Sequence, residues 1–206
     1  AEALERMKQV DTLIVDKTGT LTEGKPSVRA LIPWAGYNEQ TLWPILYGVN
    51  KSSEHPLAKA TNTYAAEHGI IPLAMTDFKA LAGRGVEATY QGKHYYFGND
   101  RLMQEIGATL TEGQLSQVTE AQRQGQTLSF LAIEKEVIAA VAIADKVKDT
   151  AAQAVKALQE QGITVVMLTG DNPLTAQAVA QQLGITHYKA GMLPEDKQQQ
   201  VKQFQQ

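Results

Sequence analysis

The side chain with the clearest chemical potential in this sequence is a single carboxylate, Asp16, at the end of an apolar run. Residues 12–15 are Thr-Leu-Ile-Val, typical of a strand, and residues 17–20 are Lys-Thr-Gly-Thr. In open α/β sheets, chemistry gathers beyond the carboxyl ends of the strands. An aspartate there can be a nucleophile, because aspartyl phosphate is an established covalent intermediate. Gly19, the hydroxyls and the backbone N–H groups suit a phosphate, so the segment predicts a phosphoryl acceptor.

Two later segments also place polar groups where elements meet. Thr-Gly-Asp-Asn at 169–172 follows an apolar run and opens a helix, where backbone N–H groups favour an anion. Met-Leu-Pro-Glu-Asp-Lys at 192–197 places Lys197 at the start of the last helix. A cation there can offset charge on a transferring phosphoryl group. The plainer interpretations are helix capping for the first segment and a surface lysine for the second.

A third constellation lies in the middle of the chain. In Ser-Glu-His-Pro-Leu-Ala, residues 53–58, Pro56 suits the first helical position and leaves His55 at the cap. An imidazole projecting from a helix start can stack on a purine or form a hydrogen bond with it. Gly83-Arg84-Gly85 and Gly98-Asn99 follow, and glycines permit close backbone approach. Taken alone, His55 is more simply explained as a capping residue.

The elements that must position these groups form two patterns. The last third alternates between strands and helices, which favours a parallel doubly wound sheet, and the strand before Asp16 is of the same type. We expect strands at 136–144, 163–168 and 185–190, helices at about 150–161 and 173–183, and a final helix after the loop 192–197. Residues 1–10 are predicted to form a short amphipathic helix.

The middle has a different character. We expect helices at 39–49 and 56–68, strands at 78–81, 85–91, 93–97 and 127–133, a hairpin turn at 91–93, and two further helices before the last strand. Tight turns between strands favour an antiparallel sheet. Gly24 and Pro26 are expected to interrupt the chain. The predicted fold is therefore α/β, with an α+β domain at 28–137 inserted into a discontinuous domain made of 1–27 and 138–206.

Composition narrows the classes of function. The chain has 206 residues, a net charge of −3 and no basic block, which argues against nucleic acid as a partner. It has no cysteine, which excludes disulfides and thiolate metal sites. No window approaches about 18 uninterrupted apolar residues, so the sequence as it stands is expected to be soluble and cytoplasmic.

The motifs together resemble those of a known family. DKTGTLT, TGDN and MLPEDK resemble the three recurrent motifs of the P-type ATPases and the wider haloacid-dehalogenase superfamily. SEHPLA, GRG and GN resemble the nucleotide-binding domain of the heavy-metal (type IB) P-type ATPases, and the N-terminal segment looks like their copper or silver branch. The resemblance covers nearly the whole chain and implies a haloacid-dehalogenase-like phosphorylation domain.

The resemblance also implies roles for particular residues. Asp16 would take the γ-phosphate of ATP, and Asp145 and Lys148 match a polar pair at the hinge between the domains. The implied catalytic residues are Asp16, Lys17, Thr18, Thr169 and Lys197. The implied nucleotide-binding residues are Asn50, Glu54, His55, Gly83, Gly85, Val86, Gly98, Asn99, Gly170 and Asp171. Asp16 and Thr18 would contribute to a Mg²⁺ site.

Three departures from the family pattern have consequences. Related phosphatases carry a second aspartate where this chain has Thr18, and a threonine is a poor general base, so the phosphoaspartate should hydrolyse slowly. Asn50 stands where the family usually has a glutamate that accepts from the adenine amine. The family's magnesium-binding GDGxND would follow Gln206. We therefore expect nucleotide binding by this chain with little or no stable autophosphorylation.

The resemblance implies the cytosolic ATP-binding and phosphorylation region of an ATP-driven exporter, most simply of copper(I) or silver. ATP and Mg²⁺ would be its cofactors. Its partners would be the transmembrane and actuator domains of the same polypeptide, with a metallochaperone or metal-binding domain as a further partner, at the cytoplasmic face of a membrane. The alternatives are a soluble haloacid-dehalogenase-type phosphatase and a non-catalytic nucleotide-binding module.

Overall fold

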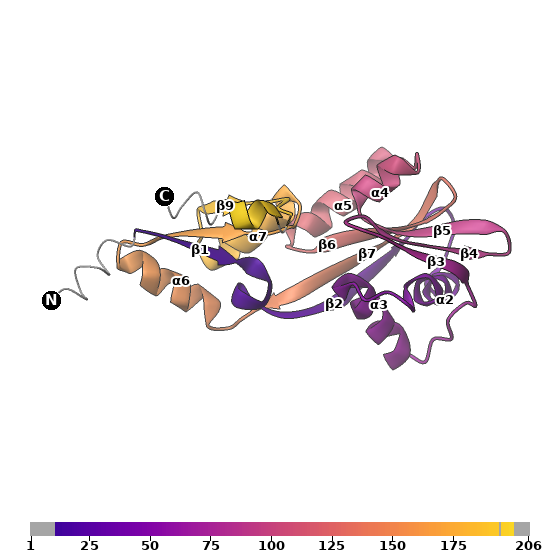
Figure 1. The fold of residues 1–206 in the computed structure, drawn as a ribbon, viewed down its shortest axis with the longest axis horizontal. Helices are drawn as coiled ribbons and strands as arrows, with labels where there is room; N and C mark the ends of the chain where they lie inside the picture. Colours follow the sequence, from indigo (N-terminus) through magenta and orange to yellow (C-terminus); the bar gives the residue numbers. More distant parts are fainter. Residues whose placement is uncertain (1–10, 194, 200–206) are drawn as a thin grey trace. The chain divides into compact units, whose positions relative to one another are not determined.

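The computed structural model describes residues 11–193 and 195–199, and these divide into two compact units. Unit 1 takes residues up to 25, residues 122–125 and residues from 145 onward (Figure 1). Unit 2 takes residues 26–121 and 126–144. The helix expected at 1–10 lies outside the described residues. So does the part of the expected final polar helix beyond residue 199.

Unit 1 contains a parallel sheet in the order β1-β8-β9. Its strands are β1 (Thr12–Asp16), β8 (Thr164–Leu168) and β9 (His187–Lys189), and its helices are α6 (Ala151–Glu160) and α7 (Pro173–Leu183). The register places Asp16 opposite Leu168, so β1 and β8 end at the same level. The predicted parallel sheet, with the strand before Asp16 in it, and the alternation of helices and strands from about residue 150 are confirmed, although β9 is shorter than expected.

The helix ends of unit 1 follow their local signals in most places. The Asn172 side chain accepts hydrogen bonds from the backbone N–H groups of Leu174 and Thr175, at 2.8 and 3.3 Å, and so caps α7. Gly184, with φ 72°, ends that helix in the left-handed conformation. Thr150 stands at the cap of α6, but its side chain makes no capping bond. The last described helical residues are 195–199, which include Lys197.

The core of unit 1 packs the two helices on the parallel sheet. Val155 of α6 and Val179 of α7 belong to one cluster with the β8 residues Val165 and Met167. Met167 is fully buried. This packing fixes the sheet edge at which β1 and β8 end.

A six-stranded sheet runs in the order β2-β7-β6-β5-β4-β3. The strands are β2 (Thr22–Pro33), β3 (Thr76–Leu81), β4 (Gly85–Tyr90), β5 (Lys93–Gly98), β6 (Thr127–Ile133) and β7 (Glu136–Val147). Neighbouring strands from β3 to β6 pair antiparallel, as the turn signals predicted. The strand expected at 136–144 was assigned to the parallel pattern, and this was wrong, because β7 pairs antiparallel with β6 in this sheet. The hairpin turn predicted between β4 and β5 is confirmed, because Gln91 and Gly92 take φ 50° and 78°, the combination that a two-residue type I′ turn requires.

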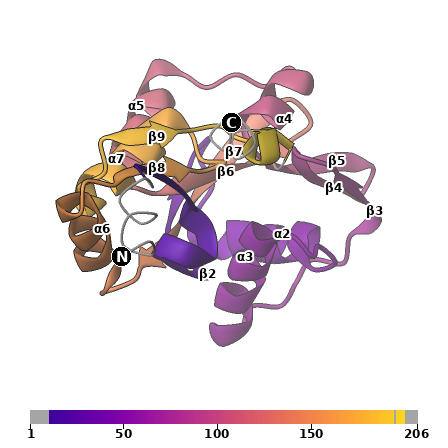
Figure 2. The ribbon, with the colours of Figure 1, turned by 60° about the vertical axis from the view of Figure 1, so that its left-hand side comes forward.

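Helices cover both faces of this sheet (Figures 1 and 2). On one face α2 (Glu39–Asn50) and α3 (Pro56–Glu67) join the cluster that contains Leu131 and Ile138. On the other face α4 (Asp100–Glu105) and α5 (Glu112–Arg123) join the cluster that contains Phe130 and Ala140. Successive side chains of a strand point to opposite faces, so β6 and β7 are apolar almost throughout.

The sequence prediction was wrong about the segment after the Asp16 loop. Gly24 and Pro26 were expected to interrupt the chain, whereas β2 runs through both from Thr22 to Pro33. In the described sheet β2 is the last strand in order, beside β7. Proline lacks an N–H group, and an outer strand tolerates that loss because one side of its ladder is not paired.

Candidate functional site

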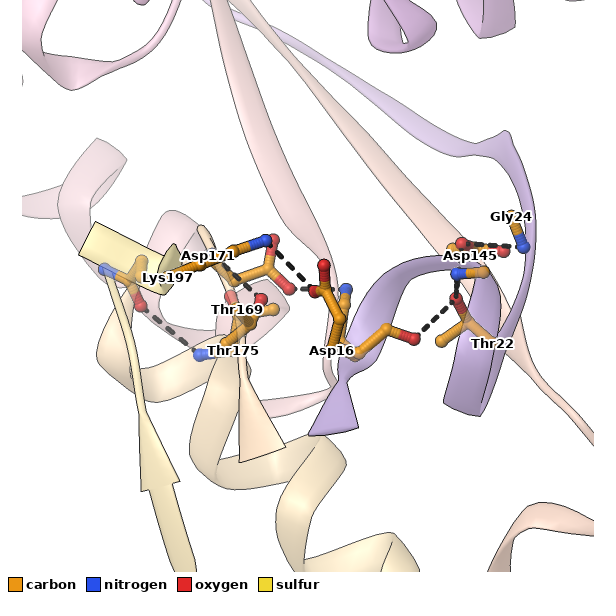
Figure 3. A network of polar contacts seen from close by, with 11 residues as sticks. Asp16, Thr22, Gly24, Asp145, Thr169, Asp171, Thr175 and Lys197 are labelled. Atoms are coloured by element: carbon orange, nitrogen blue, oxygen red, sulfur yellow. Dashed lines mark hydrogen bonds and ion pairs between the residues drawn. The ribbon is translucent and has the colours of Figure 1, made fainter. Parts of the chain in front are cut away.

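The candidate phosphoryl acceptor lies where the first two parallel strands of unit 1 end. Asp16 is the last residue of β1, and Thr169 directly follows its register partner Leu168 on β8. Lys197 donates from Nζ to Asp16 Oδ1 at 3.0 Å (Figure 3). The Asp16 side chain is 49% exposed, so its carboxylate is accessible to a substrate while a cation lies beside it. These three predicted site residues are thus brought together from distant parts of the sequence.

The loop after Asp16 is a single irregular helical turn, Lys17–Leu21 (η1). Thr18 has an extended ψ of 123°, and Gly19 has φ 79°, a region that favours glycine. The Gly19 backbone N–H donates to Thr22 Oγ1 at 3.2 Å. Thr18 is exposed, whereas Lys17 is buried. The loop therefore presents a hydroxyl outward and turns its lysine inward.

Lys17 forms an ion pair that the sequence did not reveal. Its Nζ lies 2.5 Å from Asp171 Oδ2, and the two side chains are only 9% and 15% exposed. The resemblance grouped Lys17 with the catalytic residues and Asp171 with the nucleotide-binding residues. The geometry ties the loop after β1 to the turn after β8 through both of them.

The turn after β8 is held by its own hydrogen bonds (Figure 3). Thr169, which is 1% exposed, accepts at Oγ1 from the Asp171 backbone N–H at 3.0 Å. The Thr169 N–H donates to the Lys189 carbonyl at 3.1 Å, and the Met192 N–H donates to the Thr169 carbonyl at 3.0 Å. These bonds fix the position of Thr169.

Asp145 and Lys148 both contact the segment that follows Asp16. The Asp145 carboxylate accepts from Thr22 Oγ1 at 2.6 Å and from the backbone N–H groups of Gly24 and Lys25, at 3.1 and 3.0 Å (Figure 3). Lys148 donates from its backbone N–H to the Leu21 carbonyl at 2.9 Å. All of these residues belong to unit 1, and the role of the pair at a hinge stays a prediction.

The oxygen groups beside Asp16 can contribute to a magnesium site. Across residues 11–193 and 195–199, no cluster of three or more His, Asp or Glu side chains is arranged to hold a metal. Mg²⁺ is nevertheless often bound by one or two carboxylates, with waters and substrate phosphates completing its shell. The half-exposed carboxylate of Asp16, next to the exposed Thr18, fits that kind of site.

A second candidate site is a cavity of about 380 Å³ within unit 2, a size suited to a small-molecule ligand. It is formed by the end of α2, the start of α3, the turn between β3 and β4, the end of β5 and the start of β6. Eight of the residues implied by the resemblance line it: Asn50, Glu54, His55, Gly83, Gly85, Val86, Gly98 and Asn99. Gly170 and Asp171 belong to unit 1 instead.

His55 caps α3, as Pro56 predicted. Its Nδ1 accepts a hydrogen bond from the Leu57 backbone N–H at 3.1 Å. A neutral imidazole that accepts at Nδ1 carries its proton on Nε2, which makes Nε2 a donor. Partial burial lowers the pKa of the His55 imidazole below 6.5 and so favours this neutral form.

Two facing glycines allow the strands β4 and β5 to approach at the cavity. Gly85, with φ 151°, is the register partner of Gly98. A Cβ atom on Gly85 would collide with the Phe97 carbonyl and lie 2.6 Å from the Gly98 Cα. The Asn99 side chain donates to the Gly83 carbonyl at 2.9 Å and closes this wall. The close backbone approach predicted for these glycines is therefore present.

Asn50 is fully buried at the end of α2 and carries an orphan acceptor. Its Nδ2 donates to the Leu46 carbonyl at 3.0 Å, which orients the amide. Within the described part of the chain, its Oδ1 has no hydrogen-bond partner. A buried acceptor without a partner is unfavourable by about 1–3 kcal/mol, so it marks a place where a ligand donor is favoured.

Residues 127–129 and Arg84 are among the contributions to this cavity that sequence reasoning missed. Residues 127–129 at the start of β6 line it, although they were predicted only as part of a strand. Arg84 lines it as well, although only the glycines on either side of it were predicted to be site residues. The antiparallel pairing of β5 and β6, which are separated in sequence by α4 and α5, brings residues 127–129 to this place.

The fold and the first site define the class of protein. The family model of the haloacid dehalogenase-like hydrolases matches residues 10–206, and the chain belongs to that family. Within it, the chain is 44% identical over 197 residues to the silver exporting P-type ATPase of Salmonella typhimurium. It is 43% identical over 205 residues to a copper-exporting P-type ATPase of Staphylococcus aureus (strain Newman).

These matches cover 96% and 100% of this chain but 24% and 25% of the two relatives, so the chain spans about a quarter of their length. Among solved structures, a zinc-transporting PIB-type ATPase in its E2.Pi state is similar, with 33% identity and a TM-score of 0.66 over 98% of this chain and 32% of that one. The catalytic CPx-ATPase domain CopB-B has 26% identity and a TM-score of 0.69 over 99% of this chain and 70% of that one. The predicted resemblance to heavy-metal P-type ATPases is confirmed.

In the part of the chain that the structure describes, none of the helices combines the length and the apolar character that crossing a bilayer requires.

Proposed function

We propose that this chain is the cytosolic ATP-binding and phosphorylation region of an ATP-driven heavy-metal exporter of the copper(I) or silver type. The observation that carries the proposal is the placement of Asp16 at the end of β1, beside Thr169 and within 3.0 Å of the Lys197 ammonium. The names of the silver- and copper-exporting relatives support the choice of transported ion.

The proposed chemistry is phosphoryl transfer to Asp16. A carboxylate oxygen of Asp16 bonds to the γ-phosphorus of ATP while the bond from that phosphorus to the bridging oxygen breaks, and ADP leaves with the electron pair. Lys197 stabilises the negative charge on the transferring oxygens. Mg²⁺, held through Asp16 and Thr18, would supply further charge neutralisation. Thr18 offers no base to activate water, so the phosphoaspartate persists.

The two domains take separate tasks in this proposal. In this proposal the phosphorylation domain, predicted at 1–27 and 138–206, corresponds to unit 1. The nucleotide-binding domain, predicted at 28–137, corresponds to unit 2, whose cavity receives the adenine. Asn50 Oδ1 would accept from the adenine amine, and His55 would donate from Nε2 or stack on the ring. The transmembrane and actuator domains of the same polypeptide would couple the phosphoenzyme to transport, with a metallochaperone or metal-binding domain delivering the ion.

The acceptor is tested in the longer polypeptide that the proposal implies. That protein is incubated with γ-³²P-labelled ATP and Mg²⁺ and quenched in acid, and the label should be released by hydroxylamine, as acyl phosphates are. Asp16→Asn should incorporate no label, while Asp11→Asn, at an exposed carboxylate just before β1, should incorporate it normally. Equal labelling of Asp16→Asn and the parent would contradict the proposal.

The proposed adenine site is tested at Asn50, where the family usually has a glutamate. A glutamate there would add charge and reach to the orphan acceptor, so Asn50→Glu should bind ATP more tightly than the parent chain. Isothermal titration of both proteins measures the two dissociation constants, and circular dichroism checks that the buried substitution leaves the fold intact. Unchanged affinity in a folded variant would sink the assignment of Asn50 to the adenine amine.

A further inference from the structure

We propose that Arg84 is the phosphate-binding residue of the unit 2 cavity, a role that rests on the proposed binding of ATP there. Among the described residues that line the cavity, Arg84 is the only lysine or arginine. Among the described lining residues, Glu54 is the only acidic one. Its Oε2 lies 3.3 Å from Lys59 Nζ, and this ammonium group offsets the charge of the carboxylate. A nucleotide brings several negative charges to this rim, and Arg84 is the one lining cation placed to receive them.

The backbone of Arg84 is fixed before any ligand arrives. Its N–H donates to the Leu81 carbonyl at 3.0 Å, and its carbonyl accepts from the Asn99 N–H at 2.9 Å. Gly83 and Gly85 flank it with φ 73° and 151°, so the chain turns sharply on both sides. The direction in which the side chain leaves the rim is therefore set by the turn.

The guanidinium group is also held in place. Its Nε donates to the carbonyl of Ala82, another lining residue, at 3.4 Å, and its Nη1 donates to Glu105 Oε2 at 2.7 Å. A guanidinium has five N–H groups in a rigid fork, and these two bonds use two of them. The remaining donors suit phosphate oxygens, and little side-chain freedom is lost on binding because the fork is already oriented.

The ion pair with Glu105 explains how a positive charge is tolerated beside a largely apolar cavity. The Arg84 side chain is 35% exposed and that of Glu105 is 43% exposed, so both charges remain partly in contact with solvent. A phosphate that joins the fork replaces water rather than Glu105. Arg84 thus favours ligands with phosphate groups, while Asn50 and His55 contact the base.

The experiment is isothermal titration of the full 206-residue chain with adenosine, ADP and ATP. Arg84→Gln should bind ADP and ATP about three- to tenfold more weakly, the range for one partly exposed charge-assisted contact, and should bind adenosine as the parent does. Arg84→Lys should recover part of the loss, because it keeps the charge without the fork. Arg101→Gln, at an exposed arginine of α4 outside the cavity lining, is the charge control and should leave all three affinities unchanged.

Two results would overturn the inference while leaving nucleotide binding intact. In the first, Arg84→Gln binds ATP as tightly as the parent. In the second, it loses the same factor for adenosine as for ATP, which would make Arg84 a support of the cavity wall. A parent chain that binds neither adenosine nor ATP would instead overturn the proposed nucleotide site, and this inference with it.

Discussion

At the scale of single residues, the ion pair between Lys17 and Asp171 joins the loop after β1 to the turn after β8. Breaking one partner of a nearly buried pair leaves an uncompensated charge, which is unfavourable by roughly 3–5 kcal/mol. We expect Lys17→Met to lower the free energy of unfolding by about that amount. Urea denaturation followed by circular dichroism measures the change.

The matched control for that pair replaces both partners. Lys17→Met combined with Asp171→Leu removes both charges together, so the double variant should regain most of the stability that the single variant loses. If the double variant is no more stable than Lys17→Met alone, the pair is not the source of the effect.

His55 makes stability depend on pH. Burial lowers the pKa of its imidazole below 6.5 in the folded protein, so the unfolded chain binds more protons once the pH falls below that value. The stability is therefore complete above about pH 6.5 and decreases as the pH falls through the lowered pKa. Protonation also removes the acceptor that caps α3, since Nδ1 then carries a hydrogen.

The measurement compares urea midpoints of the parent and His55→Gln at about pH 7.5 and about pH 5.5. The parent should lose more stability between these conditions than the variant does, because the variant lacks the titrating ring. An equal loss in the two proteins would assign the pH dependence to other groups.

At the scale of elements, the approach of β4 and β5 determines the wall of the cavity. Gly85→Ala places a methyl group against the Phe97 carbonyl and the Gly98 Cα, so the strands must separate. We expect a loss of at least about 2 kcal/mol in unfolding free energy, together with weaker ATP binding. Thermal unfolding and nucleotide titration of the same sample measure both effects.

Gly92 in the hairpin turn provides the matched control. It also has a positive φ, 78°, but a Cβ there would meet no atom within 4 Å. Gly92→Asn should therefore change stability by less than about 1 kcal/mol, because asparagine tolerates this conformation. A similar cost at both positions would mean that backbone conformation, rather than the approach of the strands, explains the requirement at Gly85.

Most elements were predictable because their signals are local. Asn172 with Pro173 marked one helix start and His55 with Pro56 marked another, and both caps form. The strand β2 was missed because Gly24 and Pro26 are ordinarily breakers, and only its outer place in the sheet makes them acceptable.

Contacts between distant residues could not be read in the same way. The site residues beside Asp16 were predicted from motifs, but the partner of Lys17 was not, since Asp171 lies far along the chain. The orphan oxygen of Asn50 and the position of Arg84 on the cavity also depend on tertiary packing. A sequence identifies the chemical type of such residues, and the fold decides which atoms remain unpaired.

At the scale of the whole molecule, two strands carry the chain between the units. β2 includes residues of unit 1 up to 25 and residues of unit 2 from 26, and β7 includes residues of unit 2 up to 144 and residues of unit 1 from 145. These strands are neighbours in one sheet (Figure 1). Unit 2 is therefore entered and left through adjacent, hydrogen-bonded strands, and nearly all of its contacts lie within one stretch of sequence.

The parallel pairing of β1 with β8 then has a kinetic consequence. Residue 12 pairs with residue 164, so the sheet of unit 1 closes only after the whole of unit 2 has been synthesised. Closing so long a loop is entropically costly, and it becomes easier once unit 2 has condensed and brought β2 beside β7. Both tryptophans, Trp34 and Trp43, lie in unit 2, so their fluorescence should recover during refolding before the backbone amides of β8 gain protection from hydrogen exchange. Until β8 pairs with it, the apolar run of β1 stays unpaired, and a nascent chain paused at this stage would hold a folded unit 2 but not the arrangement of side chains around Asp16.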